Sequence, residues 1–403
     1  MVQDAYIYTG VRTPFGKIGG ALAGQRPDDL AALTISAIVD RAPGLDFDGT
    51  AENLGEVIFG NANGAGEENR NVARMAWLLA GGPVSVPATT VNRLCGSSLD
   101  AAISGARQVA LGETDLVLVG GVESMSRAPW VLPKTERPYP LMNMELVNSS
   151  LGWRLTNKNM PPQWTVSLGE ATEQLREKYG ITRQRQDEFA AVSHRAAADA
   201  WAAGRYQNLT VAVPGVELSR DETIRDGTTP ETLSGLKTVF RREQGTVTAG
   251  NASPMSDGAS AAWIGSAHAE QTLGIAPQAR LAGWAAAANE PQYFGYAPVE
   301  ATNRALARAG ITWSDVGAVE INEAFAAQSL ACLDAWGFGN ELDPDIVNAW
   351  GGALAIGHPL GASGTRVLAT LAARMQASET RWGVATLCIG VGQGLAVVLE
   401  NAS

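Results

Sequence analysis

The sequence of 403 residues contains few of the residue types that build disulfide frameworks and metal sites. It has three cysteines, Cys95, Cys332 and Cys388, and no two of them share a C-x-x-C spacing. Its three histidines show no H-x-x-x-H spacing. These counts exclude a disulfide framework and argue against a structural metal site. Any thiol chemistry in this chain would therefore be catalytic.

Positive charge and long apolar runs are also scarce. The formal net charge is −11, whereas nucleic acid and anionic membrane surfaces both require a basic footprint, so we expect neither as a partner. No run approaches the roughly 20 apolar residues that cross a bilayer. The segment from Met1 to Arg12 lacks the charged and then apolar pattern of a signal peptide, which predicts a cytoplasmic protein.

The apolar residues that are present alternate between short β-branched runs and longer stretches with a 3.6-residue period. This pattern is typical of an α/β fold in which helices cover a sheet. Strand-like runs lie at Val117–Val119, Val316–Ile321 and Val384–Ile389. Helical apolar stripes comprise Leu99, Ala102, Ile103, Ala106 and Val109, and then Val367, Leu368, Leu371, Ala372 and Met375.

A weak internal repeat divides the chain. Val91-Asn92 and Val347-Asn348 each precede a glycine-containing turn, a helix and a strand, which predicts two related halves. Between them, residues 125–249 are irregular, with scattered proline and tryptophan and a net charge of +2. We predict an N-terminal half (1–124 and 250–276), an inserted loop domain (125–249) and a C-terminal half (277–403). The positive insertion could receive a phosphorylated ligand, or it could be an ordinary solvated surface.

Two residues stand where a nucleophile and a base are useful. Cys95 lies on a turn directly before a predicted helix, where free N–H groups and the helix dipole favour the thiolate. His358 lies in a glycine-rich loop that Pro359 could continue into a helix. Considered alone, a cysteine is more often a small buried hydrophobic residue than a nucleophile. His194 and His268 occur in Ala-rich stretches and are predicted to be exposed.

Two further candidates follow predicted strands. Cys388 ends an apolar strand, and Gly390 begins a tight glycine-rich hairpin that exposes backbone N–H groups. Asn322 ends the strand 318–321, at the kind of strand end where α/β proteins bind ligands, although it could simply cap a helix. Cys332 falls in the middle of a predicted helix and is assigned to packing.

At these positions the chain resembles the thiolase family, the acyl-CoA C-acyltransferases. The segments Asn92–Ser98, Asn322–Phe325, Gly357–Gly361 and Cys388–Gly390 are similar to the family's nucleophile, Asn, His and second-cysteine motifs, in the family's order. The resemblance implies two βαβαβαββ halves with layered sheets and helices, an inserted loop domain that binds coenzyme A, and a homodimer or homotetramer. It implies no permanently bound cofactor, because coenzyme A is a co-substrate.

The resemblance also implies residue roles. Cys95 would form the acyl-enzyme, His358 would activate it, and Cys388 would transfer protons. Asn322 with His358, and the N–H groups of Cys95 and Gly390, would stabilise oxyanions. Further positions match family contacts with coenzyme A or lie beside the motifs that bind it: Arg225 at the nucleotide end, Ser253 on the pantetheine arm, and Leu168, Ala324 and Phe325.

Departures from the family pattern bear on the substrate. Leu168 stands where many members have Met, and Ser167 stands where acetoacetyl-specific members have His, which argues against a short-chain substrate. Residues 60–74, 152–154 and 388–392 are similar to the β-ketoadipyl-CoA thiolases of aromatic-compound breakdown. Their substrate ends in a carboxylate, and the nearest candidates to bind it are Arg154, Lys158 and Asn159.

Several alternatives remain open. A broad 3-oxoacyl-CoA thiolase or an acetoacetyl-CoA-forming acetyltransferase would share the same motifs. A 3-ketoacyl synthase-like condensing enzyme normally pairs its cysteine with two histidines, and only His358 occurs here in a suitable motif. A non-catalytic acyl-CoA-binding protein would have no need for Cys95 and Cys388 together.

Overall fold

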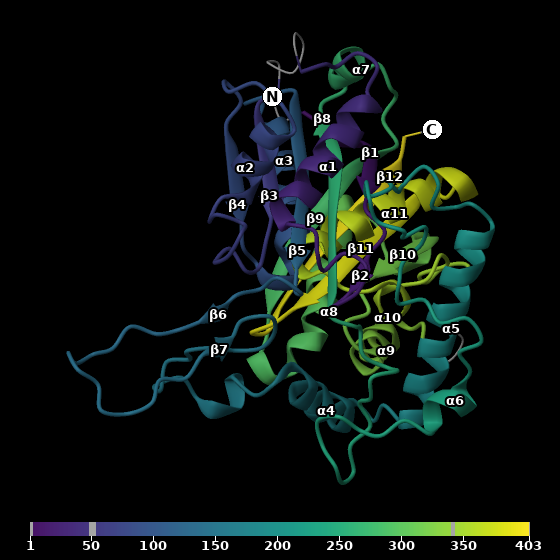
Figure 1. Ribbon diagram of the computed structural model, residues 1–403. Helices are drawn as coiled ribbons and strands as arrows, with labels where there is room; N and C mark the ends of the chain where they lie inside the picture. Colours follow the sequence, from purple (N-terminus) through teal and green to yellow (C-terminus); the bar gives the residue numbers. More distant parts are fainter. Residues whose placement is uncertain (1–2, 48–53, 340–342, 403) are drawn as a thin grey trace.

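The computed structural model describes residues 3–47, 54–339 and 343–402, and these form an α/β fold around a ten-stranded sheet (Figure 1). The strand order is β10-β11-β12-β9-β1-β8-β5-β3-β4, with β2 paired to β8. The first and last thirds of the chain each contribute several neighbouring strands. The two sets join where β1 pairs with β9.

The N-terminal part supplies one end of the sheet. Its strands are β1 (Tyr6–Arg12), β2 (Gly16–Lys17), β3 (Glu56–Gly60), β4 (Ala88–Val91), β5 (Leu116–Ser124) and β8 (Ser256–Gly265). Its helices are α1 (Pro27–Asp40), α2 (Val72–Leu79), α3 (Ser97–Leu111) and α7 (Ala269–Leu273).

The C-terminal part supplies the other end. Its strands are β9 (Ala279–Ala288), β10 (Ala318–Ile321), β11 (Trp382–Ile389) and β12 (Gln393–Asn401). Its helices are α8 (Ala297–Ala309), α9 (Ala326–Trp336), α10 (Ala353–Ile356) and α11 (Ser363–Ser378).

Three apolar clusters arrange these elements in layers. Helices α1 and α2 cover the outer face of the N-terminal strands. Helices α8 and α9 cover the outer face of the C-terminal strands. Helices α3 and α11 pack against each other between the two parts of the sheet, and the predicted stripes on both helices are buried there. The predicted layered α/β fold is confirmed.

The predicted repeat has a structural counterpart at the strands before Cys95 and His358. β3 pairs in parallel with β4, which ends at Val91. In the C-terminal part, Val347 forms a parallel bridge with Val319 of β10. In each part a parallel partner strand therefore leads into the loop that carries a candidate catalytic residue.

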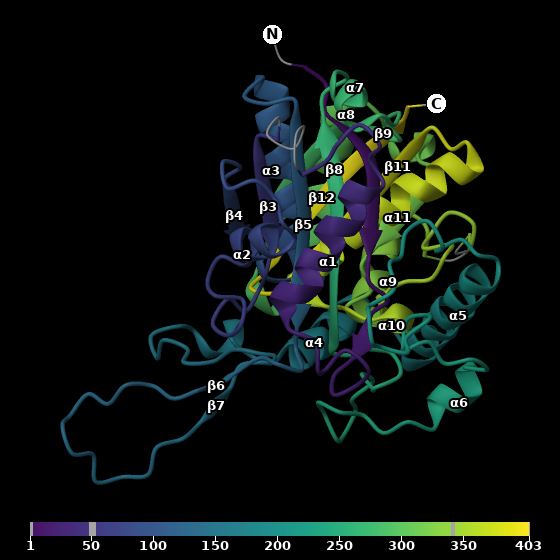
Figure 2. The ribbon, with the colours of Figure 1, turned by 45° about the horizontal axis from the view of Figure 1, so that its top comes forward.

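The segment between the two parts is irregular, as its composition predicts. It contains two-residue strands β6 (Trp130–Val131) and β7 (Val147–Asn148), and helices α4 (Leu168–Tyr179), α5 (Arg183–Ala202) and α6 (Pro230–Ser234). β6 and β7 carry an arm that projects from the body in both views (Figures 1 and 2). Helices α4 and α5 bury apolar side chains in the same cluster as α8 and α9, so they are anchored on the C-terminal part. The boundaries proposed at 124, 249 and 276 stay predictions.

Candidate active site

Cys95 lies in a single 3₁₀ turn, Leu94–Gly96, that connects β4 to α3. Leu94 adopts a left-handed conformation with a φ of 48°, which turns the chain sharply. A Cβ atom at Gly96 would come within 2.5 Å of Ile389 Cδ1, so a larger residue there would force the Ile389 side chain of β11 to move. The predicted position of Cys95 at the start of a helix is confirmed, and it lies beside the end of β11.

The Cys95 thiol is governed more by burial than by the helix start. The side chain is buried, and burial raises the pKa of Cys95 to about 11. The N–H groups of Gly390 and of Cys95 itself donate to the sulfur and offset part of that rise. The helix start is present, but loss of water outweighs it, so the resting residue is a thiol that needs a base.

His358 is placed to be that base. It is buried, and burial, with Arg366 nearby, lowers the pKa of His358 to about 3, so the imidazole is neutral at pH 7. Ser363 Oγ donates to the carbonyl of Pro359 (2.9 Å) and lies 2.6 Å from His358 Nδ1. Because the hydroxyl proton is already used, Nδ1–H is the donor of the 2.6 Å bond, and Nε2 keeps a free lone pair.

Asn322 follows β10 and faces His358. Its Nδ2 lies 3.4 Å from both imidazole nitrogens. Its Oδ1 accepts a 2.9 Å hydrogen bond from Arg366 Nη2, so the amide nitrogen is turned toward the histidine. Arg366 is fully buried on α11, 3.7 Å from the carboxylate of Glu320, which also binds Arg374. A buried charged network thus orients Asn322.

Cys388 lies near the end of β11, directly before the tight turn to β12. Its side chain packs among apolar residues that include Leu168, Phe294 and Ala324. Burial, followed by its proximity to Cys95, raises the pKa of Cys388 well above the usual value. Cys388 is therefore a thiol that holds its proton until a strong base forms beside it.

The predicted hairpin after Cys388 is confirmed. Gly390 precedes Val391, which has a φ of 64°, a conformation that is costly for a β-branched residue. Strained residues therefore flank the two backbone N–H groups that meet at the Cys95 sulfur: Leu94 precedes Cys95, and Val391 follows Gly390.

Two cavities meet at Cys95. The first, here called the apolar cavity, encloses about 840 Å³ of empty space including its open mouth. It is lined by Cys95, Met125, Leu151, Gly152, Ser167, Leu168, Gly169, Phe240, Ser253, Pro254, Met255, Phe294, Ala324, Phe325, His358 and Leu360. Ser253 N–H donates to the carbonyl of Ala324 (3.0 Å), and Ala252 forms a β-bridge with Phe325. Four of the predicted coenzyme A residues, Leu168, Ser253, Ala324 and Phe325, thus lie together.

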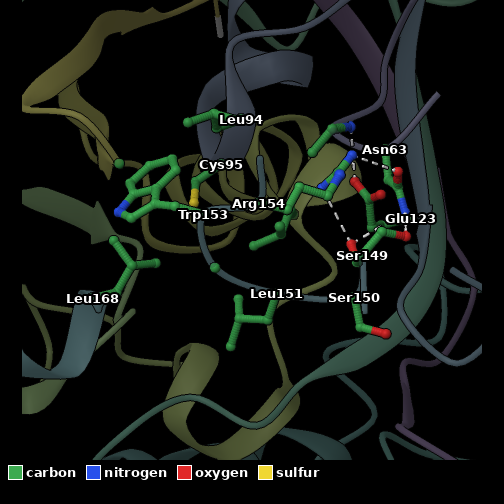
Figure 3. Close-up of a pocket in the computed structure, with 14 residues that line it drawn as sticks. Asn63, Leu94, Cys95, Glu123, Ser149, Ser150, Leu151, Trp153, Arg154 and Leu168 are labelled. Atoms are coloured by element: carbon green, nitrogen blue, oxygen red, sulfur yellow. Dashed lines mark hydrogen bonds between the residues drawn. The ribbon is translucent and has the colours of Figure 1, made fainter. Parts of the chain in front are cut away.

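The second cavity, here called the polar cavity, encloses about 520 Å³ of empty space including its open mouth, and it also contains Cys95 (Figure 3). It is lined by Ala62, Asn63, Leu94, Cys95, Glu123, Ser149, Ser150, Leu151, Gly152, Trp153, Arg154, Leu168, Leu360 and Gly390. The Arg154 side chain ends beside Asn63, Glu123 and Ser149, whereas Cys95, Trp153 and Leu168 form the opposite side. Lys158 and Asn159, the other predicted carboxylate ligands, are exposed and line neither cavity.

The fifth predicted coenzyme A residue, Arg225, is exposed and lies outside both cavities. Its backbone N–H donates to Nδ1 of His194 (3.2 Å). The prediction that His194 is exposed is wrong, because α5 packs against α10 and buries the histidine, and burial lowers its pKa to about 4. His268 is exposed as predicted, and Cys332 packs within α9.

Two buried charged residues of the site were missed by the sequence reasoning. Glu123 lies at the end of β5, and Arg366 lies next to the apolar stripe of α11. Burial raises the pKa of Glu123 to about 7, although the N–H groups of Ala62 and Gly361 donate to its Oε2. A charged residue within an apolar strand or beside a helical apolar stripe was the available signal for both.

Other ligand classes find little support in the part of the chain that the structure describes. Its His, Cys, Asp and Glu side chains form no group of three or more that could hold a metal ion. None of its helices has both the length and the apolar character needed to cross a bilayer.

Comparisons with known proteins agree with this geometry. The family model for the thiolase N-terminal domain matches residues 5–268, and that for the thiolase C-terminal domain matches residues 275–401. The chain belongs to the thiolase family. It is an acyl-transferring enzyme that carries out thiolytic cleavage with coenzyme A as co-substrate.

The chain is also similar to individual thiolases over its full length. It is 45% identical to the beta-ketoadipyl-CoA thiolase of Pseudomonas putida, covering 99% of this chain and 100% of that protein. The 3-oxoadipyl-CoA/3-oxo-5,6-dehydrosuberyl-CoA thiolase of Escherichia coli K12 gives the same identity and coverage. Among solved structures, the Bacillus anthracis acetyl-CoA acetyltransferase superposes with a TM-score of 0.90 at 33% identity, covering 99% of each chain. Human mitochondrial 3-ketoacyl-CoA thiolase gives the same TM-score and identity, covering 100% of this chain and 99% of that one.

Proposed function

We propose that this thiolase cleaves 3-oxoadipyl-CoA with coenzyme A, giving acetyl-CoA and succinyl-CoA, through an acyl-enzyme on Cys95. The full-length similarity to thiolases named for 3-oxoadipyl-CoA supports the substrate. The observation that carries the chemistry is the set of protonation states around Cys95: a buried thiol, a neutral imidazole in the same cavity, and a second buried thiol close by.

In the first half of the reaction, neutral His358 accepts the Cys95 proton and the sulfur attacks the 3-keto carbon. Asn322 and His358 stabilise the resulting oxyanion. The bond between C2 and C3 then breaks, and its electron pair leaves on C2 as the carbanion of acetyl-CoA. Cys388 protonates that carbanion, and a succinyl group remains on Cys95.

In the second half, the Cys388 thiolate removes the proton of an incoming coenzyme A thiol. The coenzyme A sulfur attacks the succinyl thioester, and its oxyanion is stabilised by the N–H groups of Cys95 and Gly390. Both groups already donate to the Cys95 sulfur in the structure. Succinyl-CoA leaves, and the proton held by His358 returns to Cys95.

The histidine positions favour a thiolase over a condensing synthase. His358 alone lines the cavities at Cys95, while His194 lies beside Arg225 and His268 lies on the surface. The second basic partner that a synthase would place near the cysteine is replaced by Asn322, held by Arg366.

The apolar cavity would bind the pantetheine arm of coenzyme A. Phe240, Phe294 and Phe325 give it an apolar wall, and Ser253 offers a polar side chain on its lining. Arg225 would meet the phosphates on the surface outside the cavity. No permanently bound cofactor is needed for this chemistry.

We also propose that the chain forms a homodimer or homotetramer. Strand β4 ends the sheet, and its free edge could pair with a second copy. The arm between β6 and β7 exposes Tyr139, Leu141 and Met142, which is unusual for a surface that stays in water. Light scattering should give two or four times the mass of one chain, and a monomer would contradict the proposal.

The substrate proposal is tested by kcat/KM for 3-oxoadipyl-CoA, acetoacetyl-CoA and 3-oxohexanoyl-CoA, the last being the uncharged analogue of equal length. We expect 3-oxoadipyl-CoA to be the preferred substrate. A preference for 3-oxohexanoyl-CoA would overturn the substrate while leaving the thiolase chemistry intact.

A further inference from the structure

The polar cavity contains an arginine whose polar partners are neutral. Arg154 is half-buried; its Nη2 donates to Asn63 Oδ1 (3.0 Å) and its Nη1 donates to the Ser149 carbonyl (3.4 Å). Across the described residues, no Asp or Glu oxygen lies within 4.0 Å of its guanidinium. Other arginines of the same segment do have such partners: Arg127, Arg176, Arg183 and Arg241 each pair with a carboxylate.

A guanidinium in this state is ready to bind an anion. It has five N–H donors in a planar fork, and the two acceptors it contacts are an amide oxygen and a backbone carbonyl. Hydrogen bonds from arginine to a carboxylate are stronger than those to neutral acceptors, and withdrawing the charge from water without a counter-charge is unfavourable. A carboxylate that enters the cavity would supply the missing counter-charge.

The position of Arg154 defines which part of the substrate it meets. The polar cavity includes Cys95, to which the acyl group would be attached, and Gly390. It shares Cys95, Leu151, Gly152, Leu168 and Leu360 with the apolar cavity, but it contains none of Ser253, Ala324 and Phe325. The pantetheine arm and the acyl chain must leave Cys95 in different directions. The acyl chain therefore extends toward Arg154, Asn63 and Ser149 (Figure 3).

Glu123, on the same wall, does not form an ion pair with Arg154, and its Oε2 is held by two backbone N–H groups. Because burial raises its pKa to about 7, a large share of Glu123 is the neutral acid at neutral pH. The net charge of this wall is therefore positive or zero, which suits an anionic end group on the substrate.

We propose that Arg154, held in place by Asn63, is the subsite that binds the distal carboxylate of a dicarboxylic 3-oxoacyl-CoA. This rests on the proposed function, because it assigns a residue to the substrate preference stated there. Arg154 is a specificity residue that touches the acyl group, and it takes no part in the chemistry at Cys95.

The test compares kcat/KM for 3-oxoadipyl-CoA and 3-oxohexanoyl-CoA in the wild-type enzyme, in two variants of the subsite and in one control variant. Arg154→Met keeps much of the side-chain volume and removes the charge. We expect its kcat/KM for 3-oxoadipyl-CoA to fall by about 30- to 100-fold, with the value for 3-oxohexanoyl-CoA changed by less than about threefold. Lys158→Met removes an exposed cation four residues further along and should change neither value.

The second variant, Asn63→Asp, leaves Arg154 in place and occupies its guanidinium with a carboxylate. It should cause the same selective loss, and it gives an answer if Arg154→Met does not fold. Acylation of Cys95 by succinyl-CoA and by butyryl-CoA, followed by intact-mass spectrometry, should show the same contrast in both variants.

The outcomes separate the two proposals. An equal loss for both substrates would mean that Arg154 only holds the 149–154 loop, and no loss for either would mean that another group binds the carboxylate; each result overturns the subsite. If the wild-type enzyme shows no preference for 3-oxoadipyl-CoA, the proposed substrate fails, and the subsite fails with it.

Discussion

The two cavities that meet at Cys95 differ in composition, although all three parts of the chain contribute residues to each. The apolar cavity has Met125, Phe240, Phe294 and Phe325 on its walls, and its residues come from all three parts of the chain. The polar cavity has Asn63, Glu123, Ser149 and Arg154, which come from the N-terminal part and from the start of the middle segment.

This difference shows how one enzyme can bind the coenzyme A arm, which is constant, separately from the acyl group, which varies between substrates. Coenzyme A is the same in every thiolase reaction, so an apolar wall that surrounds its arm suffices. The acyl group distinguishes one substrate from another, and a polar group is rejected or accepted most sharply by placed polar partners. Changes at Cys95 should therefore affect both cavities, whereas changes further out should affect only one.

The largest effect is expected for Cys95→Ala, because Cys95 belongs to both cavities. Removing the nucleophile should lower turnover by about 10⁴-fold or more and abolish the acyl adduct. The matched control is Cys332→Ala: this cysteine is also fully buried, but it donates to the Gly295 carbonyl within the core. Peptide mapping after incubation with succinyl-CoA should place the adduct on Cys95. An adduct on Cys388 or Cys332 would refute the assignment.

A second, smaller effect should divide turnover from acylation. Cys388 contacts apolar residues that line the apolar cavity, but it lines neither cavity itself. Cys388→Ser should reduce turnover by about 10²- to 10⁴-fold, since the hydroxyl is a poorer proton donor, yet still allow acylation of Cys95. Single-turnover and steady-state rates measured on the same preparation decide this. If both fall together, Cys388 supports the fold and does not transfer the proton.

The sequence predicted the positions of these residues better than their electrostatics. Strand and helix patterns placed Cys95, Asn322 and Cys388 correctly, because each lies where a strand ends. The helix start at Cys95 was visible in the sequence, but the burial that keeps Cys95 protonated until a base acts was not, because it depends on the distant strand β11. The prediction that His194 is exposed was wrong for the same reason, because an Ala-rich helix does not reveal which of its faces is covered in the fold.

The polar cavity was also only partly predictable. The chemistry of a dicarboxylic substrate selected Arg154, Lys158 and Asn159 together. Only the folded loop shows that Arg154 is half-buried in the cavity, whereas Lys158 and Asn159 are exposed. Glu123 and Arg366 were missed because single charged residues in apolar stretches carry no motif. Their importance depends on contacts with segments more than 40 residues away, such as Gly361 and Asn322.

The protonation state of Cys95 predicts an intermediate effect that needs no substitution. Since burial raises its pKa to about 11, the thiolate fraction should grow about tenfold for each pH unit below that value. Alkylation of Cys95 by iodoacetamide should therefore accelerate by about 100-fold between pH 7 and pH 9, without a plateau. Quantitative mass spectrometry of the Cys95 peptide measures the rate. A plateau that begins below pH 7 would indicate a thiolate–imidazolium pair, and would show that His358 is charged at rest.

The smallest effect is expected outside both cavities, at Arg225. Its side chain is exposed, so a contact with a phosphate of coenzyme A contributes only about 0.2–1 kcal/mol in water. Arg225→Ala should therefore raise the KM for coenzyme A by about twofold to fivefold with little change in kcat, the result expected when ground state and transition state lose the same contact. The increase should shrink as salt is raised, because salt screens exposed charges.

Arg205→Ala is the control, because it removes another exposed cation of the same segment and should leave the KM for coenzyme A unchanged. A fall in kcat at constant KM would contradict the phosphate contact and would show that the Arg225 side chain has another role, since alanine keeps the backbone N–H that donates to His194.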